Sequence, residues 1–294
     1  MFSRRSVLAG LLMLGLLAVA PAYAAPPEER VSGFSTFIGT YYGGKFRDAL
    51  LYVSGTVPSL EPVPLVLVLH GLYQDAQTAD AASGFEAVAD SEKLAVVYPY
   101  GLDGSWNAGN CCGASSAKRV DDVGFLAHIV QLVSAVRPID PTRVYIAGFS
   151  NGGMMALKAA CARPDVFAAA ASVAGTLQDS CAGDGPFSAL FLHGTSDRTV
   201  PFDGMKYSKF LGTELTPVPR AATVVASRDR CQVRTASSLG RATRTLFSSC
   251  DAGTAVEIYA VAGMGHIWPR FDKQGVDGGR IVWDFLRVHS RAPR

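Results

Sequence analysis

A serine flanked by small residues carries the most specific chemical signal in the sequence. Gly148, Ser150 and Gly152 form a Gly-x-Ser-x-Gly pattern between a β-rich run, 144–146, and a helix-prone run, 154–162. A strand, a sharp turn and a helix are the context in which this pattern forms a nucleophile elbow. Glycines on both sides leave room for the strained backbone that such a serine requires. The alternative interpretation is a glycine-rich turn with a solvated serine.

A serine hydroxyl becomes a useful nucleophile when a neighbouring base takes its proton and an acid fixes the tautomer of that base. Of the five histidines, His266 is the best candidate for the base, because it lies in a glycine-rich loop directly after a predicted strand. Ligands bind at that edge of open α/β sheets. Three other histidines are expected to be structural or to lie on the surface: His128, His193 and His289. His70 lies at a predicted strand end, directly before Gly71.

The acid should follow the strand that comes after the nucleophile. Asp197 meets this condition, because it follows the predicted strand 189–193 and a short turn. Asp203 is its local competitor. The chain order Ser150, Asp197, His266 is that of an α/β-hydrolase triad. These three residues predict the hydrolysis of an ester or amide through a covalent intermediate.

Two backbone amides are expected to bind the negative charge that develops on the substrate carbonyl oxygen. One is the amide of Asn151, because the residue after the nucleophile begins a helix, where negative charge is favoured. The other is the amide of Leu72, because His70 and Gly71 make the turn after the buried strand 64–69. Loss of one such donor typically raises the barrier by about 3 kcal/mol.

The apolar runs that end at these residues are predicted to be buried strands of one sheet. The predicted strands are 47–54, 64–69, 94–98, 144–146, 167–173, 189–193, 242–247 and 255–261. The predicted helices are 76–91, 121–136, 154–162, 219–228 and 280–289. Buried strands that alternate with helices predict an α/β-hydrolase fold, in which helices cover both faces of a mainly parallel central sheet. No large lid is expected, and residues 203–250 are the candidate cover.

The N-terminus has the pattern of a secretory signal. Arg4 and Arg5 precede the apolar stretch 7–19, and Ala22-Tyr23-Ala24 is an A-x-A cleavage site. The arginine pair also partly matches a twin-arginine signal. The alternative is an uncleaved membrane anchor, but the stretch is short for a span and Pro21 interrupts it. We expect residues 1–24 to be removed on export to the periplasm or beyond the cell, 25–34 to be a flexible lead, and 35–294 to be one catalytic domain.

The composition excludes some partners. The chain has 294 residues, 49% of them hydrophobic, with a formal net charge of +2. Removal of residues 1–24, which hold two arginines and no acid, brings this charge to zero (+2 − 2 = 0). Because no basic run occurs elsewhere, nucleic acid and stable membrane association after signal removal are not expected as partners. We expect a monomer.

Six cysteines in an exported chain indicate disulfides. Cys231 and Cys250 flank a predicted hairpin and are the first predicted pair. Cys161, late in the helix after the elbow, is predicted to reach Cys181. The adjacent residues Cys111 and Cys112 either form a bridge with each other or stay reduced, and free thiols are the alternative for all six.

Six blocks of sequence together resemble the secreted esterases of polyhydroxybutyrate-depolymerase type, a family that is itself similar to feruloyl and acetyl-xylan esterases of carbohydrate esterase family one. The blocks are His70-Gly71, the loop from Trp106-Asn107 to Cys111-Cys112-Gly113, Val120 to Phe125, Gly148 to Gly153, His193 to Pro201, and Gly265 to Pro269. The likeness spans about residues 35–288. It implies a serine-esterase fold and the triad named above. Relatives often have cysteine where this chain has Leu72, so the resemblance leaves the pairing of Cys111 and Cys112 open.

Four further residues are candidates for the substrate pocket: His70, Trp106, Asn107 and Trp268. For the last three, loop packing is an equal alternative. Asp121 and Asp122 are expected to cap the following helix and to bind the nearby loop rather than to act in catalysis.

These observations predict a secreted serine esterase that works through an acyl-enzyme without a metal or an organic cofactor. The expected substrates are small or oligomeric esters: polyhydroxybutyrate-type oligomers, or feruloyl or acetyl esters of polysaccharides. Two alternatives stay open. One is a secreted serine peptidase with the same triad order, and the other is a noncatalytic binding protein on the hydrolase fold.

Overall fold

The computed structural model describes residues 33–55, 60–181, 183 and 185–292. The predicted signal segment and most of the predicted lead therefore lie outside the described residues. All described residues belong to one unit of the chain. Within this part of the chain, no helix combines the length and apolar character needed to cross a membrane.

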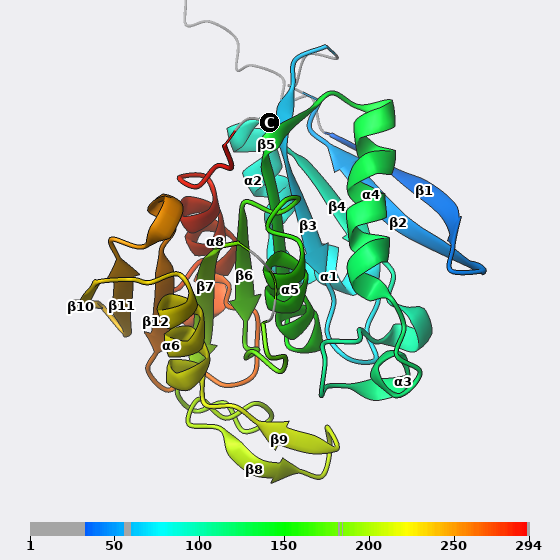
Figure 1. The fold of residues 1–294 in the computed structure, drawn as a ribbon. Coiled ribbons are helices and arrows are strands. Elements are labelled where there is room, and N and C mark those ends of the chain that lie inside the picture. The colour runs from blue at the N-terminus through cyan, green and yellow to red at the C-terminus, as the bar shows by residue number, and fades with distance from the viewer. Residues whose placement is uncertain (1–32, 56–59, 182, 184, 293–294) are drawn as a thin grey trace, which may run out of the picture. The chain divides into compact units, whose positions relative to one another are not determined.

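A sheet of ten strands has the order β1-β2-β4-β3-β5-β6-β7-β12-β11-β10 (Figure 1). Its strands are β1 (Phe34–Tyr42), β2 (Lys45–Val53), β3 (Val63–Leu69), β4 (Ala95–Pro99), β5 (Ile139–Phe149), β6 (Ala169–Val173), β7 (Ser188–Gly194), β10 (Val233–Leu239), β11 (Ala242–Ser248) and β12 (Val256–Val261). Neighbouring strands from β4 through β3, β5, β6 and β7 to β12 are parallel, and the pairs outside them are antiparallel. The parallel strands bring the ends of β3, β5, β7 and β12, and hence the predicted site, to one edge.

Helices cover both faces of this sheet. Their bounds are α1 (Ala76–Ser83), α2 (Phe85–Glu92), α3 (Gly113–Ala117), α4 (Asp122–Val136), α5 (Asn151–Ala162), α6 (Val218–Arg228), α7 (Phe271–Gln274) and α8 (Gly278–Leu286). In Figure 1, α4, α5 and α6 lie in front of the sheet, and α1, α2 and α8 lie behind it. The mainly parallel sheet and its two helical layers form the α/β-hydrolase fold that the sequence predicts.

The apolar core has two parts because side chains alternate along each strand. In β3, Leu65, Leu67 and Leu69 join the core beneath α4, α5 and α6. Val66 and Val68 point the opposite way and join the core against α1, α2 and α8. All five are fully buried, at 0% exposure. A continuous apolar run is what a strand covered on both faces requires.

Several elements differ from the predictions. The single helix expected over 76–91 is two helices, because Gly84 adopts a left-handed conformation (φ +70°) between α1 and α2. Strand β1 was not predicted: its Phe34, Phe37 and Tyr41 are exposed, so it lacks the apolar alternation of a half-buried strand.

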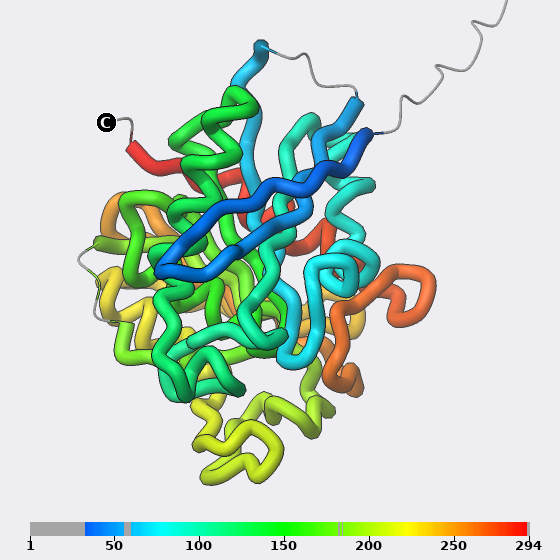
Figure 2. The backbone as a smooth tube through the Cα atoms, turned by 90° about the vertical axis from the view of Figure 1, so that its right-hand side faces the viewer, coloured from blue at the N-terminus to red at the C-terminus, as the bar shows by residue number. Residues whose placement is uncertain are grey.

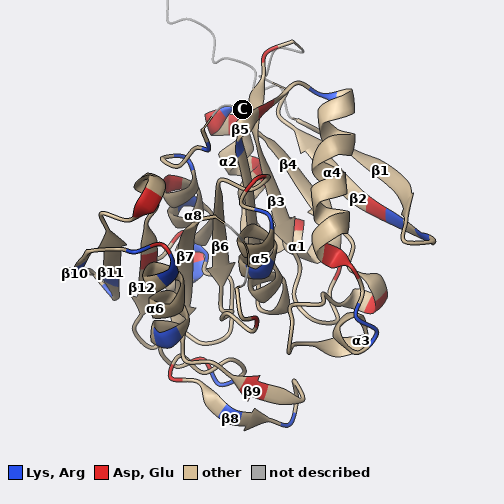
Figure 3. Ribbon diagram, in the orientation of Figure 1, with Lys and Arg blue, Asp and Glu red and all other residues tan. Residues whose placement is uncertain are grey.

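A two-stranded hairpin, β8 (Met205–Ser208) and β9 (Thr213–Leu215), was not predicted either. In Figures 1 and 2 it is drawn in yellow-green at the lower end of the molecule, beyond the ends of the parallel strands. It lies within the stretch 203–250 that was expected to be the cover. Figure 3 shows Lys and Arg interspersed with Asp and Glu over the elements drawn.

Candidate active site

The elbow at Ser150 joins β5 directly to α5. Ser150 has φ +54° and ψ −119°, and its amide donates to the Val173 carbonyl at 2.8 Å. A Cβ atom at Gly148 would collide with the backbone of Gly152. A Cβ atom at Gly152 would lie 2.6 Å from the carbonyl oxygen of Leu69, at the end of β3. The two glycines therefore let the turn close on itself and let the loop after β3 pack against it.

The side chains of the predicted triad come together at this turn. Ser150 Oγ lies 3.0 Å from His266 Nε2, and His266 Nδ1 lies 2.7 Å from Asp197 Oδ2. The other carboxylate oxygen of Asp197 accepts hydrogen bonds from the amides of Thr199 and Val200, each at 2.9 Å. The competing candidate, Asp203, is exposed. This arrangement has the serine-to-base and base-to-acid contacts that nucleophilic catalysis requires.

Hydrogen bonding keeps the Asp197 carboxyl ionised. Burial alone would raise its pKa, but contacts with His193 and His266 and the Val200 amide outweigh burial and hold the pKa well below the ordinary value of 3.8. A carboxylate in this state accepts the Nδ1 proton of His266 and leaves Nε2 free to accept a proton from Ser150.

The two predicted oxyanion amides are free of intramolecular acceptors. Within the described part of the chain, the backbone amides of Leu72 and Asn151 donate to no protein group. The turn that presents Leu72 is held on both sides: the Gly71 amide donates to Gln74 Oε1 at 2.8 Å, and the Tyr73 amide donates to the Gly104 carbonyl at 2.7 Å. Free amides on a fixed turn are what a hole for a developing anion needs.

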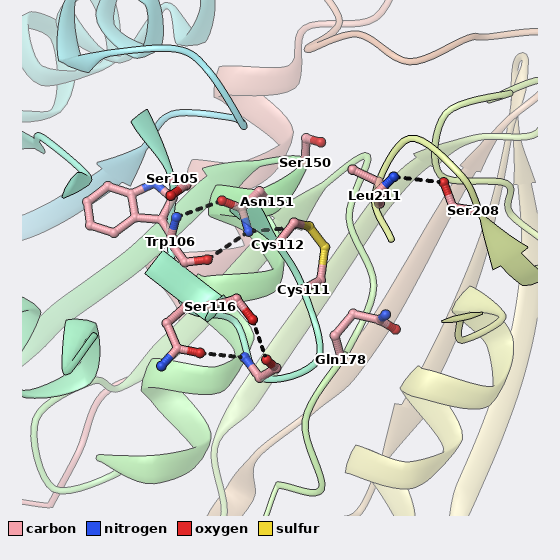
Figure 4. The surroundings of a disulfide bond; sticks show 12 residues. Ser105, Trp106, Cys111, Cys112, Ser116, Ser150, Asn151, Gln178, Ser208 and Leu211 are labelled. Atoms are coloured by element: carbon pink, nitrogen blue, oxygen red, sulfur yellow. Dashed lines mark hydrogen bonds between the residues drawn. A yellow bond between two sulfur atoms is a disulfide. The ribbon is translucent and has the colours of Figure 1, made fainter. Parts of the chain in front are cut away.

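Asn151 contributes its side chain as well as its amide. Its Oδ1 accepts from the amide of Trp106 at 2.8 Å, and its Nδ2 donates to the carbonyl of Trp106 at 3.0 Å (Figure 4). Nδ2 also lies 3.7 Å from Cys112 Sγ. The side chain is fully buried, so it joins the start of α5 to the loop that carries Cys111 and Cys112.

Three residues predicted to line the pocket instead form hydrogen bonds with the backbone of neighbouring loops. The side chains of His70 and Trp106 are fully buried, at 0% exposure. His70 Nε2 accepts from the Gly101 amide at 2.9 Å, and Trp106 Nε1 donates to the His70 carbonyl at 3.0 Å. Asn107 is half-buried, and its Nδ2 donates to the Val120 carbonyl at 2.8 Å. These contacts favour loop packing, the alternative interpretation of Trp106 and Asn107, and the full burial of His70 leaves it no exposed surface to line a pocket.

Comparison with known proteins decides the family. Residues 50–278 match the sequence model of the Esterase family. The chain belongs to this family. It is a carboxylic ester hydrolase, as the sequence blocks predict.

Relatives include "Putative esterase NocK" of Nocardia uniformis subsp. tsuyamanensis, which is 34% identical over 86% of this chain and 80% of its own length. Poly(3-hydroxyalkanoate) depolymerase C of Paucimonas lemoignei is 28% identical over 86% of this chain and 67% of that protein. Among solved structures, the CE1 ferulic acid esterase of Anaeromyces mucronatus superposes with a TM-score of 0.60 at 13% identity, over 92% of this chain and 96% of that one. The last likeness concerns the fold alone.

An apolar cavity of about 280 Å³ lies beside the predicted triad. His266, Phe149 and the predicted pocket residue Trp268 line it, together with one side of α1. The ring of Phe149 also packs on the imidazole of His266, with centroids 4.8 Å apart. A second, more polar cavity of about 460 Å³ is lined by groups that include Gln178, Glu214 and Arg220.

Three disulfides tie the loops of the esterase. They join Cys161 to Cys181, Cys231 to Cys250, and Cys111 to Cys112, the pairs that the sequence suggests. The vicinal pair lies on the Gln178 side of Asn151 (Figure 4). Gln178 connects the loop of the vicinal pair to β9. Its carbonyl accepts from the Asn110 amide at 3.0 Å, and its side chain bonds the backbone of Glu214 and Thr216.

A buried ion pair beneath the site was not predicted. Arg47 Nη2 lies 2.9 Å from Asp122 Oδ1, and both side chains are at most 2% exposed. The second oxygen of Asp122 accepts from the Asn107 amide at 2.8 Å. Asp121 instead caps α4 by accepting from the Gly124 amide, as expected. The sequence separation of 75 between Arg47 and Asp122 explains why sequence spacing gave no signal for the pair.

Proposed function

We propose that this ester hydrolase is an exported serine esterase that uses Ser150, His266 and Asp197 to form and hydrolyse an acyl-enzyme. The single observation that carries the proposal is the 3.0 Å contact between Ser150 Oγ and His266 Nε2, with His266 Nδ1 held by Asp197 at 2.7 Å. A candidate base must lie within about 3.2 Å of the proton that it takes, and this one does.

In the first half of the reaction, Ser150 Oγ attacks the ester carbonyl while His266 Nε2 takes the hydroxyl proton. The tetrahedral intermediate collapses when the same imidazole returns the proton to the departing alcohol. In the second half, a water molecule takes the place of the alcohol, and its attack frees the acid and restores Ser150. Asp197 stays ionised throughout and stabilises the imidazolium.

The amides of Leu72 and Asn151 donate to the oxyanion in both halves. Their value comes from their fixed position, because a donor that is already in place costs no reorganisation in the transition state. Support comes from their lack of other acceptors in the described part of the chain, and from the bonds that hold the Gly71 to Gln74 turn.

The substrates that we propose are small or oligomeric esters of polyester or plant-polysaccharide origin. The name of one relative, a polyhydroxyalkanoate depolymerase, favours hydroxybutyrate oligomers, and the six sequence blocks that resemble feruloyl and acetyl-xylan esterases keep feruloyl and acetyl esters in the proposal. The apolar cavity beside His266, with Phe149 and Trp268 on its wall, suits the less polar side of such an ester.

We further propose that residues 35–294 form a single, monomeric catalytic domain that needs no metal or organic cofactor. Export is supported by the secretory pattern of residues 1–24 and by the three disulfides. Disulfides persist in oxidising compartments, which agrees with a periplasmic or extracellular location.

Replacement of the nucleophile tests the proposal. Ser150→Ala should reduce kcat for p-nitrophenyl acetate by about 10⁴-fold or more, because the covalent step is lost. Thermal unfolding should change little. A fluorophosphonate probe should label the wild type and leave Ser150→Ala unlabelled.

Two further measurements separate the alternatives. A peptidase would hydrolyse a matched p-nitroanilide measurably in a Ser150-dependent reaction, an esterase would hydrolyse the p-nitrophenyl ester alone, and a noncatalytic binding protein would hydrolyse neither. A panel of p-nitrophenyl esters of rising chain length, methyl ferulate, acetylated xylan and hydroxybutyrate oligomers then defines the substrate. Retained turnover by folded Ser150→Ala would contradict the assignment of the nucleophile.

A further inference from the structure

A second imidazole lies behind the triad. His193, near the end of β7, is fully buried, and its Nε2 lies 2.7 Å from the carbonyl oxygen of Val200. The same nitrogen lies 3.4 Å from Asp197 Oδ2, the oxygen that accepts from His266 Nδ1. His193 was predicted to be structural, but its ring lies within reach of the Asp197 carboxylate.

The partners of His193 fix its tautomer. A carbonyl oxygen only accepts, so Nε2 must carry the proton that it donates to Val200. Nδ1 is buried and has no partner among the described residues. A proton there would leave a buried donor without an acceptor, which is the costlier arrangement. The Nε2–H of His193 therefore points toward Val200 and Asp197 together.

The His193 Nε2–H faces two groups of the turn that holds Asp197: the Val200 carbonyl and the Asp197 carboxylate. The Val200 amide donates to Asp197 Oδ1 at 2.9 Å, while the Val200 carbonyl accepts from His193. Across the turn, Oδ2 faces the His193 N–H. The ring of Phe202 packs edge-on against the His193 ring at 6.0 Å. The carboxylate is thus fixed between two imidazoles, one from β7 and one from the loop after β12.

We propose that His193 is a positioning residue of the reaction: it holds the Asp197 carboxylate in the orientation that His266 needs. The inference rests on the proposed function of the triad. The titratable side chains that contact Asp197 are His193 and His266. The contact with His193 favours the ionised form of Asp197, so its loss should leave the carboxylate more basic.

Three variants test the role. His193→Leu keeps an apolar side chain of similar length but removes the donor. His193→Gln keeps an N–H group near the position of Nε2. His128→Leu is the matched control, because His128 is a half-buried histidine on α4, outside the site. All are assayed with p-nitrophenyl acetate between pH 5 and 9, with rates normalised to sites labelled by a fluorophosphonate.

His193→Leu should reduce kcat per labelled site by about 10- to 100-fold with little change in KM, because a misplaced catalytic group costs rate rather than binding. The acid limb of kcat/KM should move to higher pH, because loss of the His193 donor leaves the Asp197 carboxylate more basic. His193→Gln should recover most of the rate and bring the acid limb of kcat/KM back toward its wild-type position. His128→Leu should match the wild type.

A purely structural His193 gives a different result: fewer labelled sites and a lower melting temperature, with kcat per site and the pH profile unchanged. That result would overturn the inference, as would a His193→Gln variant that behaves like His193→Leu. If Ser150→Ala stays active, the proposed function itself fails. A wild type that depends on Ser150 but is indifferent to His193 removes the positioning role alone.

Discussion

The Asn151 side chain offers a sharp test of how the elbow is held. Asn151→Ala retains the backbone amide that the proposed oxyanion hole uses, and it removes the paired contacts with the Trp106 backbone and the longer contact with Cys112 Sγ. Alanine is also an excellent helix residue, so the start of α5 should not suffer from propensity. The effect of the change therefore comes from the contact with the loop 106–112.

The magnitude follows from what each Trp106 group loses. The Trp106 carbonyl still accepts from the Ala108 amide at 3.0 Å, so it keeps a partner. The Trp106 amide donates to Asn151 Oδ1 and is left without its acceptor beside a fully buried side chain. A buried donor without an acceptor costs about 1–3 kcal/mol, and the lost packing adds to this. We expect the free energy of unfolding to fall by about 2–3 kcal/mol.

Catalysis should weaken as well, since the loop no longer anchors the residue that supplies the amide. Complete loss of an oxyanion donor costs about 100- to 1,000-fold in kcat, so a loosened one should cost about tenfold. KM should change little, because the interaction strengthens in the transition state.

Urea denaturation followed by circular dichroism measures the stability, and p-nitrophenyl acetate turnover measures kcat. Asn110→Ala is the control, because it makes the same truncation at an exposed position of the same loop, and its stability should stay within about 0.5 kcal/mol of the wild type. Equal urea midpoints for Asn151→Ala and Asn110→Ala would refute the reasoning, because they would mean that the Asn151–Trp106 pairing contributes nothing.

Two further predictions concern charges near the site. Asp197→Asn should lower kcat by about 10³- to 10⁴-fold, because an amide favours the wrong tautomer of His266. The pKa of Asp197 in the folded state lies below 3.8, so its ionised carboxylate stabilises the fold above that pH and this stability is lost as the pH falls below it. As the pH is lowered from 6 to 3, the urea midpoint should therefore fall less steeply in Asp197→Asn than in the wild type. Arg47→Met should cost about 3–5 kcal/mol of stability, because it leaves Asp122 buried without a counter-charge, and adding Asp122→Asn should recover part of this in urea titrations. No recovery in the double variant would show that the loss comes from the packing of Arg47 on Phe125 instead.

The parts of the site that lie at strand ends could be predicted from the sequence. Ser150 directly follows an apolar run, Asp197 and His266 each follow one after a short turn, and parallel strands bring such ends to one edge of the sheet. The structural role of Gly148 and Gly152 could also be predicted, because a nucleophile elbow constrains the backbone locally. Local pattern is enough wherever one residue and its neighbours in the chain decide the outcome.

The residues whose surroundings the sequence did not predict depend on burial, which a single sequence does not reveal. His70 and Trp106 have the residue types of a binding pocket, yet both are enclosed by the loops on either side of them. Arg47 and the β1 strand were not recognised for the opposite reason: a charged residue lies inside, and aromatic residues such as Phe37 and Tyr41 lie outside. In each case a partner distant in the chain overrides the preference of the residue itself.

Leu72 connects the two halves of the proposed oxyanion hole. Its Cδ1 lies close to Gly113, so close that a Cβ atom on Gly113 would lie 2.8 Å from it. Gly113 directly follows the disulfide of Cys111 and Cys112, and Asn151 contacts the same loop through Trp106 and Cys112. One loop therefore touches both residues whose amides are proposed to bind the oxyanion. Gly113 has φ +71°, a conformation that L side chains rarely adopt, so Gly113→Ala should strain this loop and reduce kcat for p-nitrophenyl acetate, although Gly113 touches no reacting atom.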